Sequence, residues 1–224
     1  MVKETPKTFL WWALFLTITL FGSGVILGIF FESSREQAIS QDYKETETFW
    51  QDVRLQSFFY QIMNAEVCEQ AISENLNFAD RIYQEGLVLQ RYEGANELTG
   101  TILLDKKRYV LLKTEFWLNS IILNKKCENM SIPTVVYFYS QYPKSIAKKA
   151  EQAAVSSVLF NLKEKYGNGI LLIPLAADLN ITVVDIIKDK YNLTEFPVVL
   201  INEKTKFAGV PKIEDLEEAA GLKP

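Results

Sequence analysis

The chain of 224 residues contains no histidine and only two cysteines, Cys68 and Cys127. Without histidine there is no imidazole to act as a general base, to activate a serine or cysteine nucleophile, or to bind a metal ion. Two isolated sulfur atoms do not complete a tetrahedral zinc site without help from carboxylates. The sequence therefore argues against most hydrolytic and metal-dependent chemistry, and we expect neither a metal ion nor a cofactor.

The chain also lacks a strong excess of charge. It has 24 Lys and Arg against 28 Asp and Glu, which gives a formal net charge of -4. The basic residues are scattered among acidic ones, whereas a protein that binds nucleic acid needs a basic stripe to neutralise phosphates. We therefore expect no nucleic-acid partner.

One long segment, residues 8–31, has no charged residue and reads TFLWWALFLTITLFGSGVILGIFF. As a helix with a rise of about 1.5 Å per residue, it is long enough to cross the roughly 30 Å of a bilayer core. It is longer than the apolar part of a typical signal peptide, and no clear cleavage site precedes Glu32. We interpret it as a transmembrane helix that engages the lipid bilayer, with a cleaved signal peptide and a buried globular helix as the alternatives.

The charges beside this segment predict its orientation. Lys3 and Lys7 precede it, whereas Glu32, Arg35 and Glu36 follow it. Cytoplasmic flanks of membrane helices carry the excess of basic residues. We therefore expect residues 1–7 to form a cytoplasmic tail and the rest of this single-pass protein to lie outside the cytoplasm.

Two glycines within the apolar segment, Gly24 and Gly28, are four residues apart. This spacing lets two membrane helices approach closely, although glycine is common in such helices without any pairing. A homodimer through the membrane helix is therefore one of two interpretations, and a monomer is the other.

The next residues are polar and then helical in pattern. Residues 32–48 read as a stalk or as the start of a long helix that leaves the membrane, and we favour a solvated spacer. In residues 49–128 apolar positions recur at steps of three and four, which predicts amphipathic helices. A glycine-bounded break at residues 94–100 precedes a further helix from about Asp105 to Lys125. We interpret the aromatic residues of this part as core packing.

After Pro133 the pattern changes to short β-branched and aromatic runs that alternate with helical stretches. The order is βαβαββα, which predicts an α/β fold with helices on both faces of a sheet and a parallel first pair of strands. We expect strands at 134–140, 170–175, 197–202 and 206–210, and helices at 145–166, 183–191 and 213–220.

Over residues 131–224 this order, together with the phrase YNLTEFPVVLIN at 191–202, resembles the thioredoxin fold. The resemblance implies that Pro197 is in the cis conformation just before the third strand. The plan of the whole chain also resembles single-span, thioredoxin-like proteins of prokaryotic envelopes, in which a helical segment separates the anchor from the thioredoxin unit.

The resemblance further implies a groove for extended peptides. In redox-active relatives the residues around the cis proline pair with the substrate backbone, which would make Glu195 and Phe196 contact positions in this chain. The loop from the first strand to its helix borders the same groove and contains Tyr142 and Pro143.

The chain departs from the thioredoxin family at the position of the family's reactive cysteines. Thioredoxins place a C-x-x-C pair at the start of the first helix, where the helix N-terminus stabilises a thiolate. Here residues 140–152 read SQYPKSIAKKAEQ and contain no cysteine. Neither Ser145 nor Ser156 replaces it, because an unactivated hydroxyl does not exchange with disulfides. The usual dithiol reaction is therefore not available to this domain.

The two cysteines lie outside the thioredoxin-like region, one in a predicted helix and one just past the last helix of the segment. In an oxidising compartment two lone cysteines most often form a structural disulfide, which for a loop of about sixty residues contributes on the order of 4 kcal/mol. Three interpretations stay open: a structural Cys68–Cys127 bridge, two free buried thiols, and a redox-active pair.

Two functions follow. We favour a membrane-anchored, extracytoplasmic, non-catalytic module that binds a peptide or protein, or acts as a scaffold. The alternative is a thiol-disulfide oxidoreductase that uses Cys68 and Cys127. The missing C-x-x-C outweighs the fold resemblance that supports this alternative, because a fold alone does not imply function. The expected organisation is a tail at 1–7, a membrane helix at 8–31, a stalk at 32–48, a helical segment at 49–128 and a thioredoxin-like domain at 131–224.

Overall fold

The structure is a computed structural model that describes residues 6–94, 100–127 and 131–222. The chain divides into two compact units, Met1–Gln56 and Ser57–Pro224. Most of the predicted cytoplasmic tail and most of the predicted break near residue 97 lie outside the described residues.

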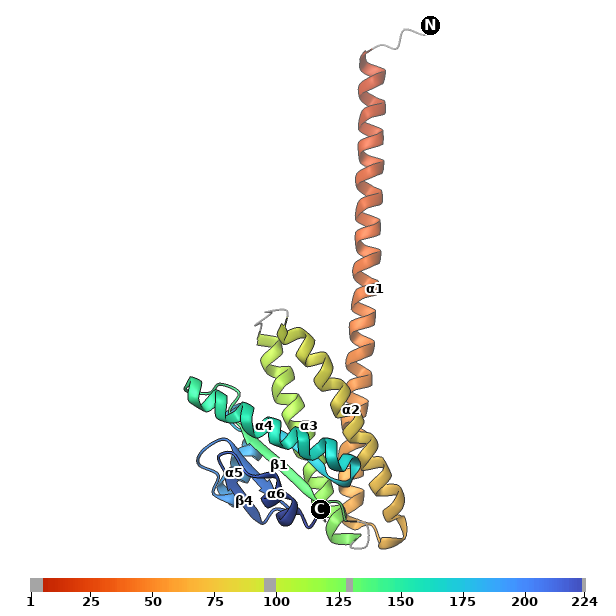
Figure 1. The fold of residues 1–224 in the computed structure, drawn as a ribbon. Helices are drawn as coiled ribbons and strands as arrows, with labels where there is room; N and C mark the ends of the chain where they lie inside the picture. The colour runs from red at the N-terminus through yellow and green to blue at the C-terminus, as the bar shows by residue number, and fades with distance from the viewer. Residues whose placement is uncertain (1–5, 95–99, 128–130, 223–224) are drawn as a thin grey trace. The chain divides into compact units, whose positions relative to one another are not determined.

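The elements follow the predicted order (Figure 1). The strands are β1 (Thr134–Tyr139), β2 (Leu171–Ala176), β3 (Val198–Ile201) and β4 (Thr205–Ala208). The helices are α1 (Pro6–Ile62), α2 (Cys68–Gly94), α3 (Gly100–Lys126), α4 (Ile146–Tyr166), α5 (Thr182–Tyr191) and α6 (Ile213–Ala220), with 3-10 turns η1 (Ala65–Val67) and η3 (Gly167–Gly169). The predicted fold class is confirmed: a helical region is followed by a βαβαββα domain.

The N-terminal unit consists of the greater part of α1, a helix of 57 residues. The predicted stalk is helical within it, so residues 32–48 continue the helix that contains the apolar segment. The helical course agrees with the interpretation of these residues as part of a long helix. The favoured interpretation as a solvated spacer stays a prediction.

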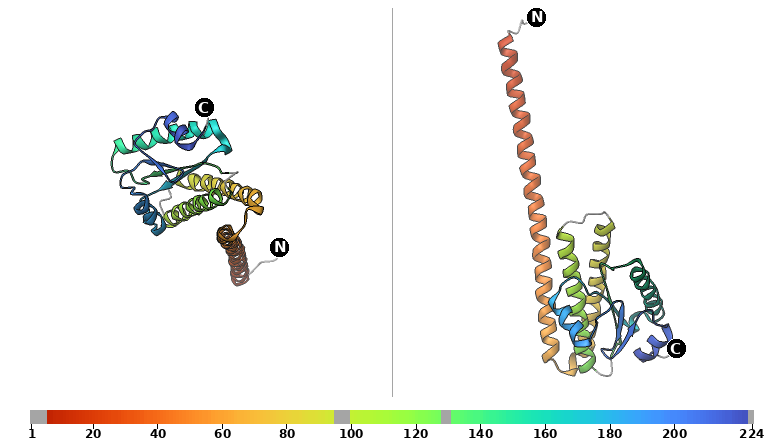
Figure 2. Two further views of the ribbon diagram at one scale, coloured as in Figure 1. Left: turned by 90° about the horizontal axis from the view of Figure 1, so that it is seen from below. Right: turned by 90° about the vertical axis from the view of Figure 1, so that its left-hand side faces the viewer.

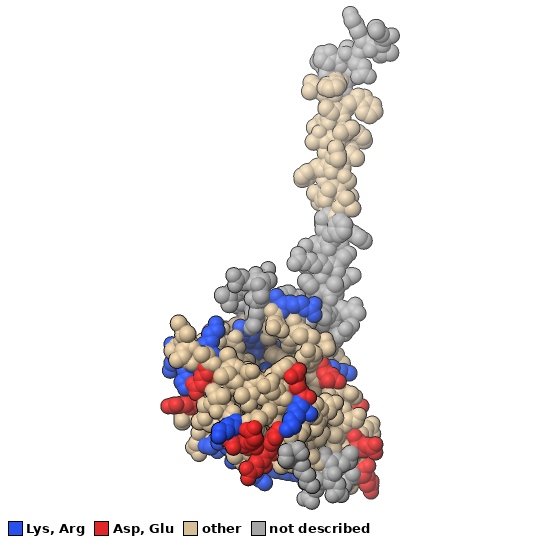
Figure 3. Space-filling view, viewed as in Figure 1, with Lys and Arg blue, Asp and Glu red and all other residues tan. Residues whose placement is uncertain are grey.

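Among the described residues, one helix segment is long and apolar enough to span a membrane: Phe9–Leu27, with a mean hydropathy of 1.9 and none of it buried. Figure 3 shows no charged side chain along the part of it that is drawn in colour. The hydroxyls of Thr17 and Thr19 each donate to the carbonyl oxygen four residues earlier, at 2.8 Å, so their polar groups are satisfied within the helix. A signal sequence and a retained anchor share these properties.

The sheet of the second unit has the strand order β2-β1-β3-β4. Strands β1 and β2 are parallel, as predicted for a pair joined by a helix, whereas β3 runs antiparallel to both β1 and β4. The sheet is mixed, and β2 and β4 are its edges. With the βαβαββα order and the cis bond between Phe196 and Pro197, the domain resembles the thioredoxin fold.

Helices cover both faces of this sheet (Figure 2). One face packs against α4 and α6 in a core of Val135, Tyr137, Val155, Leu159, Leu162, Ile170, Val199, Ile201, Leu216 and Ala220. On the other face, Trp117 of α3 contacts Phe138 of β1 and Tyr191 of α5, with ring centroids 5.9 Å and 6.0 Å apart. The helical region is therefore part of the same compact unit as the sheet.

A charged residue of α3 is buried between helices. The Lys113 side chain is 5% exposed, and its ammonium nitrogen lies 4.1 Å from the centroid of the Tyr109 ring. The absence of a side chain at Gly86 of α2 leaves room for the Tyr109 hydroxyl, which a Cβ atom there would meet. Burial lowers the pKa of Lys113 to about 7, because the interior disfavours the charged form.

We expect Lys113→Met to raise the free energy of unfolding by about 2–4 kcal/mol near pH 6, because it removes a buried ammonium with little change of shape. Between about pH 7 and 10 the native lysine is neutral while the unfolded chain still binds the proton, so the wild-type protein gains stability and the difference shrinks. Urea unfolding of the full chain in detergent, followed by circular dichroism, measures both effects. Lys125→Met, at an exposed position of the same helix, is the control, and a difference independent of pH would contradict the prediction.

Candidate functional site

Three loops meet at one end of the sheet, beyond the ends of its strands. Because β1 and β2 are parallel, their carboxyl ends lie together, with Tyr139 opposite Ala176. Strand β3 runs the other way and starts at this end, with Val198 opposite Phe138. The loops after β1 and β2 and the cis-proline loop before β3 therefore share one end of the domain, where ligands of open α/β sheets commonly bind.

The sequence-predicted residues occupy two of these loops. Pro197 is buried and cis, Phe196 is half-buried and Glu195 is exposed. In the β1–α4 loop, Tyr142 is 58% exposed and Pro143 is half-buried. Their role in binding a peptide stays a prediction.

One electrostatic interaction links the cis-proline loop to the first turn of α4. The carboxylate of Glu151, and with a smaller effect that of Glu195, raises the pKa of the exposed Lys148 ammonium in the first turn of α4. The Glu195 carboxylate is therefore close enough to Lys148 of α4 to affect the pKa of its ammonium. No hydrogen bond or ring contact within the described parts of the chain joins Tyr142 to Glu195 or Phe196.

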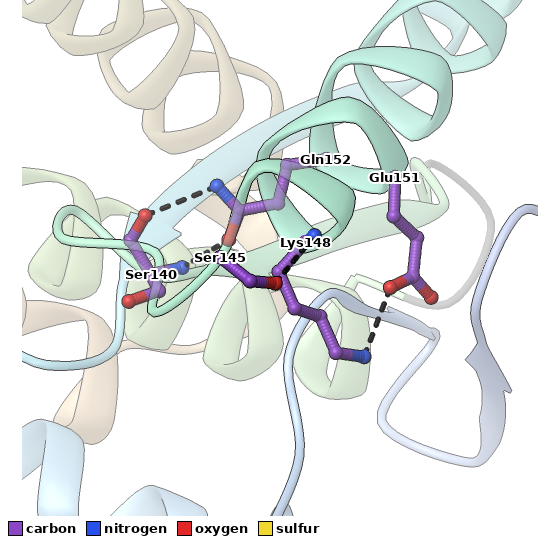
Figure 4. Close-up of polar contacts among 5 residues, drawn as sticks. All are labelled: Ser140, Ser145, Lys148, Glu151 and Gln152. Atoms are coloured by element: carbon purple, nitrogen blue, oxygen red, sulfur yellow. Dashed lines mark hydrogen bonds and ion pairs between the residues drawn. The ribbon is translucent and has the colours of Figure 1, made fainter.

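The start of α4 is fixed by short-range polar contacts (Figure 4). The Ser145 hydroxyl caps the helix by accepting a hydrogen bond from the Lys148 backbone N–H at 3.2 Å, as N-cap serines do. The Lys148 ammonium pairs with Glu151 at 2.9 Å. The first turn of α4 is therefore held by a capping serine and an ion pair, and residues 140–152 contain no cysteine.

A glutamine of α4 holds the end of β1 (Figure 4). The Gln152 side chain accepts from the Ser140 backbone N–H at 2.8 Å and donates to the Ser140 carbonyl at 3.1 Å. The Tyr137 hydroxyl in turn donates to the Gln152 backbone carbonyl at 3.0 Å. The Gln152 side chain thus satisfies the backbone N–H and carbonyl of Ser140, the residue directly after β1, where the loop leaves the sheet.

An aspartate in the β2–α5 loop fastens the β1–α4 loop from the other side. The Asp178 carboxylate accepts from the backbone N–H groups of Gln141 at 2.7 Å and Tyr142 at 3.0 Å, and from the Ser140 hydroxyl. Burial alone would raise the pKa of Asp178, but the bonds from Ser140, Tyr142 and Gln141 outweigh it and lower that pKa. The loop therefore closes around an ionised carboxylate.

Sequence reasoning missed Asp178 and Gln152. One signal was available, since Asp178 follows the buried strand β2 by two residues and so lies at the end of the sheet where the loops of a parallel pair meet. For Gln152 no such signal exists, because its partner Ser140 is twelve residues away and the contact depends on how α4 crosses the sheet.

The two cysteines form a disulfide, and no free cysteine is present. Cys68 begins α2 and Cys127 directly follows α3, with their Cα atoms 5.8 Å apart. Both are buried, at 7% and 5% exposure, in a cluster with Tyr60, Met63, Ala71 and Leu123. The interpretation of two free thiols is therefore wrong, and the bridge closes the α2–α3 pair.

This disulfide lies near the start of β1, away from the three loops. Just before Cys127, the Asn124 side chain exchanges two hydrogen bonds with the Ile132 backbone, at 2.7 Å and 3.0 Å, and β1 begins at Thr134. Strand β1 has six residues, which span roughly 20 Å. The three loops lie at the other end of this strand. The sulfur atoms and the cis proline therefore do not form one site.

No protein-family model matches the chain, and no curated protein matches it. A solved structure described as that of a malarial protein is 20% identical to it, covers 39% of this chain and 92% of its own, and has a TM-score of 0.30. Another, of thioredoxin-2, described as a component of the malaria parasite protein secretion machinery, is 22% identical, covers 38% of this chain and 77% of its own, and has a TM-score of 0.28.

We expect Asp178→Asn to lower the free energy of unfolding by about 1–3 kcal/mol at pH 7, because the amide cannot accept all three hydrogen bonds. The pKa of Asp178 is lower in the folded than in the unfolded chain, so its stabilising effect is present above about pH 4 and is lost as the pH falls through the native pKa. Urea titrations of the variant and the wild-type protein between about pH 7 and 2 should therefore converge. Asp189→Asn, at an exposed position of α5, is the control; curves that stay parallel would argue against this role of Asp178.

Proposed function

We propose that this chain is a membrane-anchored, extracytoplasmic, thioredoxin-like protein that binds a peptide or another protein without catalysing dithiol exchange. The observation that carries the proposal is the β1–α4 loop. This loop contains no cysteine. The backbone N–H groups of Ser140, Gln141 and Tyr142 already donate to the side chains of Gln152 and Asp178. A rigid loop beside a cis proline suits recognition, because a preformed surface loses little conformational entropy on binding.

The binding residues of this proposal come from the two facing loops. Glu195 and Phe196 would pair with the backbone of an extended peptide, while Tyr142 and Pro143 would contact its side chains. The exposed Tyr142 ring supports this assignment, since aromatic residues are enriched where proteins bind one another.

The anchor and the domain limits are part of the same proposal. The exposed apolar helix Phe9–Leu27 would engage the lipid bilayer and keep the N-terminus in the cytoplasm. The helical region of residues 49–128 would then lie between the anchor and the thioredoxin-like domain of residues 131–224. Pairing of two chains through Gly24 and Gly28 stays an alternative to a monomer in the membrane.

The oxidoreductase alternative has less support. An exchange reaction needs an accessible sulfur for thiolate attack, and Cys68 and Cys127 are both buried. Their distance from the cis-proline loop also separates them from the surface that would hold a substrate. The bridge is better explained as a structural link between α2 and α3.

A charged residue at Phe196 tests the binding surface. We expect Phe196→Asp to reduce, by about tenfold or more, the yield of photo-crosslinks formed from a reactive amino acid placed at position 142, because a buried carboxylate opposes an apolar contact. The yield is measured in intact cells by immunoblotting. Ile186→Asp, at a 60% exposed position of α5, is the matched control; crosslinks unchanged by Phe196→Asp would refute the placement of the site.

Thiol trapping tests the role of the disulfide. We expect neither Cys68 nor Cys127 to react with a maleimide in intact cells before reduction, and both to react after strong reduction and unfolding, because the bridge is buried. Mass spectrometry of the labelled peptides measures both states. Partial labelling without reductant, or a mixed disulfide with another protein, would restore the oxidoreductase alternative.

A further inference from the structure

A groove of about 470 Å³ lies between α4 and the sheet, on the face that α4 covers. Strands β1 and β2 contribute Tyr137, Tyr139 and Pro174 to it, and α4 contributes Ala153 and Phe160. The Phe160 ring is 61% exposed, although it lies on a helix whose opposite side is core. The volume falls in the range of known ligand sites, about 300–1,000 Å³.

The groove is predominantly apolar and its charges are of one sign. Lys149 and Lys163 of α4 line it, and no Asp or Glu is among its described lining residues. Lys163 is already occupied, because its ammonium donates to the carbonyls of Gly167 at 2.7 Å and Ile170 at 2.9 Å. Burial lowers the pKa of Lys163, and the negative charge of Asp80 on α2 opposes that shift only in part. The cation available to a ligand is therefore Lys149.

The length of the groove fits an extended chain. Lys149 and Lys163 are fourteen residues apart on α4, which is roughly 21 Å along a helix. An extended peptide covers this distance with about six residues. The open shape of the groove along a helix also favours a chain over a compact small molecule.

The edge strand beside the groove disfavours simple strand addition. Leu171 and Ala177 donate their backbone N–H groups towards the β1 side, to Pro133 and Tyr139. Alternate residues point the other way, which places Pro174 at a position facing the free edge, where it has no N–H to donate. A ligand of the groove is therefore recognised mainly through side chains, since proline at an edge opposes pairing.

We propose that this groove is a second binding surface, which accepts an extended apolar segment of another protein with an acidic residue at the end that meets Lys149. The apolar side chains of that segment lie over Tyr137, Tyr139 and Phe160. The surface is built by α4 and the β1–β2 pair, so it does not depend on Glu195, Phe196 or the cis-proline loop. It can exist whether or not the proposed function of that loop is correct.

Two synthetic peptides of about seven residues test the proposal. Both alternate Val or Leu with Ser or Thr and carry fluorescein at one end; one begins with Glu and the other with Lys. Binding to the full chain in lipid nanodiscs is measured by fluorescence anisotropy, with empty nanodiscs subtracted to remove partition into lipid. We expect the Glu peptide to bind about fivefold more tightly than the Lys peptide.

Charge reversal gives the sharpest comparison. We expect Lys149→Glu to reverse the preference, so that the Lys peptide binds more tightly, whereas Lys204→Glu in the exposed β3–β4 turn leaves the preference unchanged. Phe160→Asp should weaken the binding of the Glu peptide about tenfold, and Phe196→Asp should leave that binding unchanged. A melting curve by circular dichroism shows whether each variant is folded; the exposed positions of Lys149 and Phe160 favour that outcome.

Three results would overturn the inference. The first is equal binding of both peptides to the wild-type protein. The second is loss of the Glu peptide in Phe196→Asp but not in Phe160→Asp, which would place the peptide at the cis-proline loop instead. The third is self-association of the chain that Phe160→Asp abolishes, which would make a second copy the occupant. Failure of the Phe196 crosslinking test alone would leave this inference standing.

Discussion

The contact between the Trp117 indole and the Glu203 carboxylate holds the second unit together. The indole is fully buried and its N–H donates to Glu203 at 2.7 Å, while the Thr134 hydroxyl donates to the same carboxylate oxygen, also at 2.7 Å. One acceptor thus joins α3, the first residue of β1 and the turn between β3 and β4. A buried indole N–H without a partner would be costly, so α3 and the sheet must come together in this register.

The two ends of the sheet are fixed by different means. At the start of β1 the Cys68–Cys127 bridge ties the ends of α2 and α3, whereas at the other end Asp178 and Gln152 tie the loops by hydrogen bonds. Asp178 accepts from the backbone N–H groups of Gln141 and Tyr142 in the loop, and Ser145 accepts from that of Lys148 in α4. Side-chain acceptors on both sides therefore close the β1–α4 loop and begin the helix.

Much of this fold could be predicted from the sequence because local patterns specify it. Periodicity and glycine gave the limits of α4 closely: Ser145 caps it, and Gly167 ends it with a φ of 50° that favours glycine. The cis proline followed from a phrase around Pro197. What could not be predicted joins residues far apart in sequence, such as Trp117 to Glu203, which are 86 residues apart. The helical course of the polar stretch at 32–48 was ambiguous because it has no apolar face to read.

For the candidate site and the groove as well, local patterns could be read from the sequence, whereas contacts between distant residues could not. Sequence resemblance indicated Phe196 and Tyr142, but it did not reveal Asp178, whose role depends on the meeting of two loops. It also interpreted the aromatic residues of 49–128 mainly as core, which is correct for the buried Trp117 and wrong for Tyr83, whose side chain is 63% exposed. It made no prediction for Phe160 of α4. The α3 face of the sheet is closed by Trp117, while the α4 face leaves apolar surface beside Pro174. An edge protected from strand pairing, next to a face left uncovered, favours recognition by side chains over aggregation.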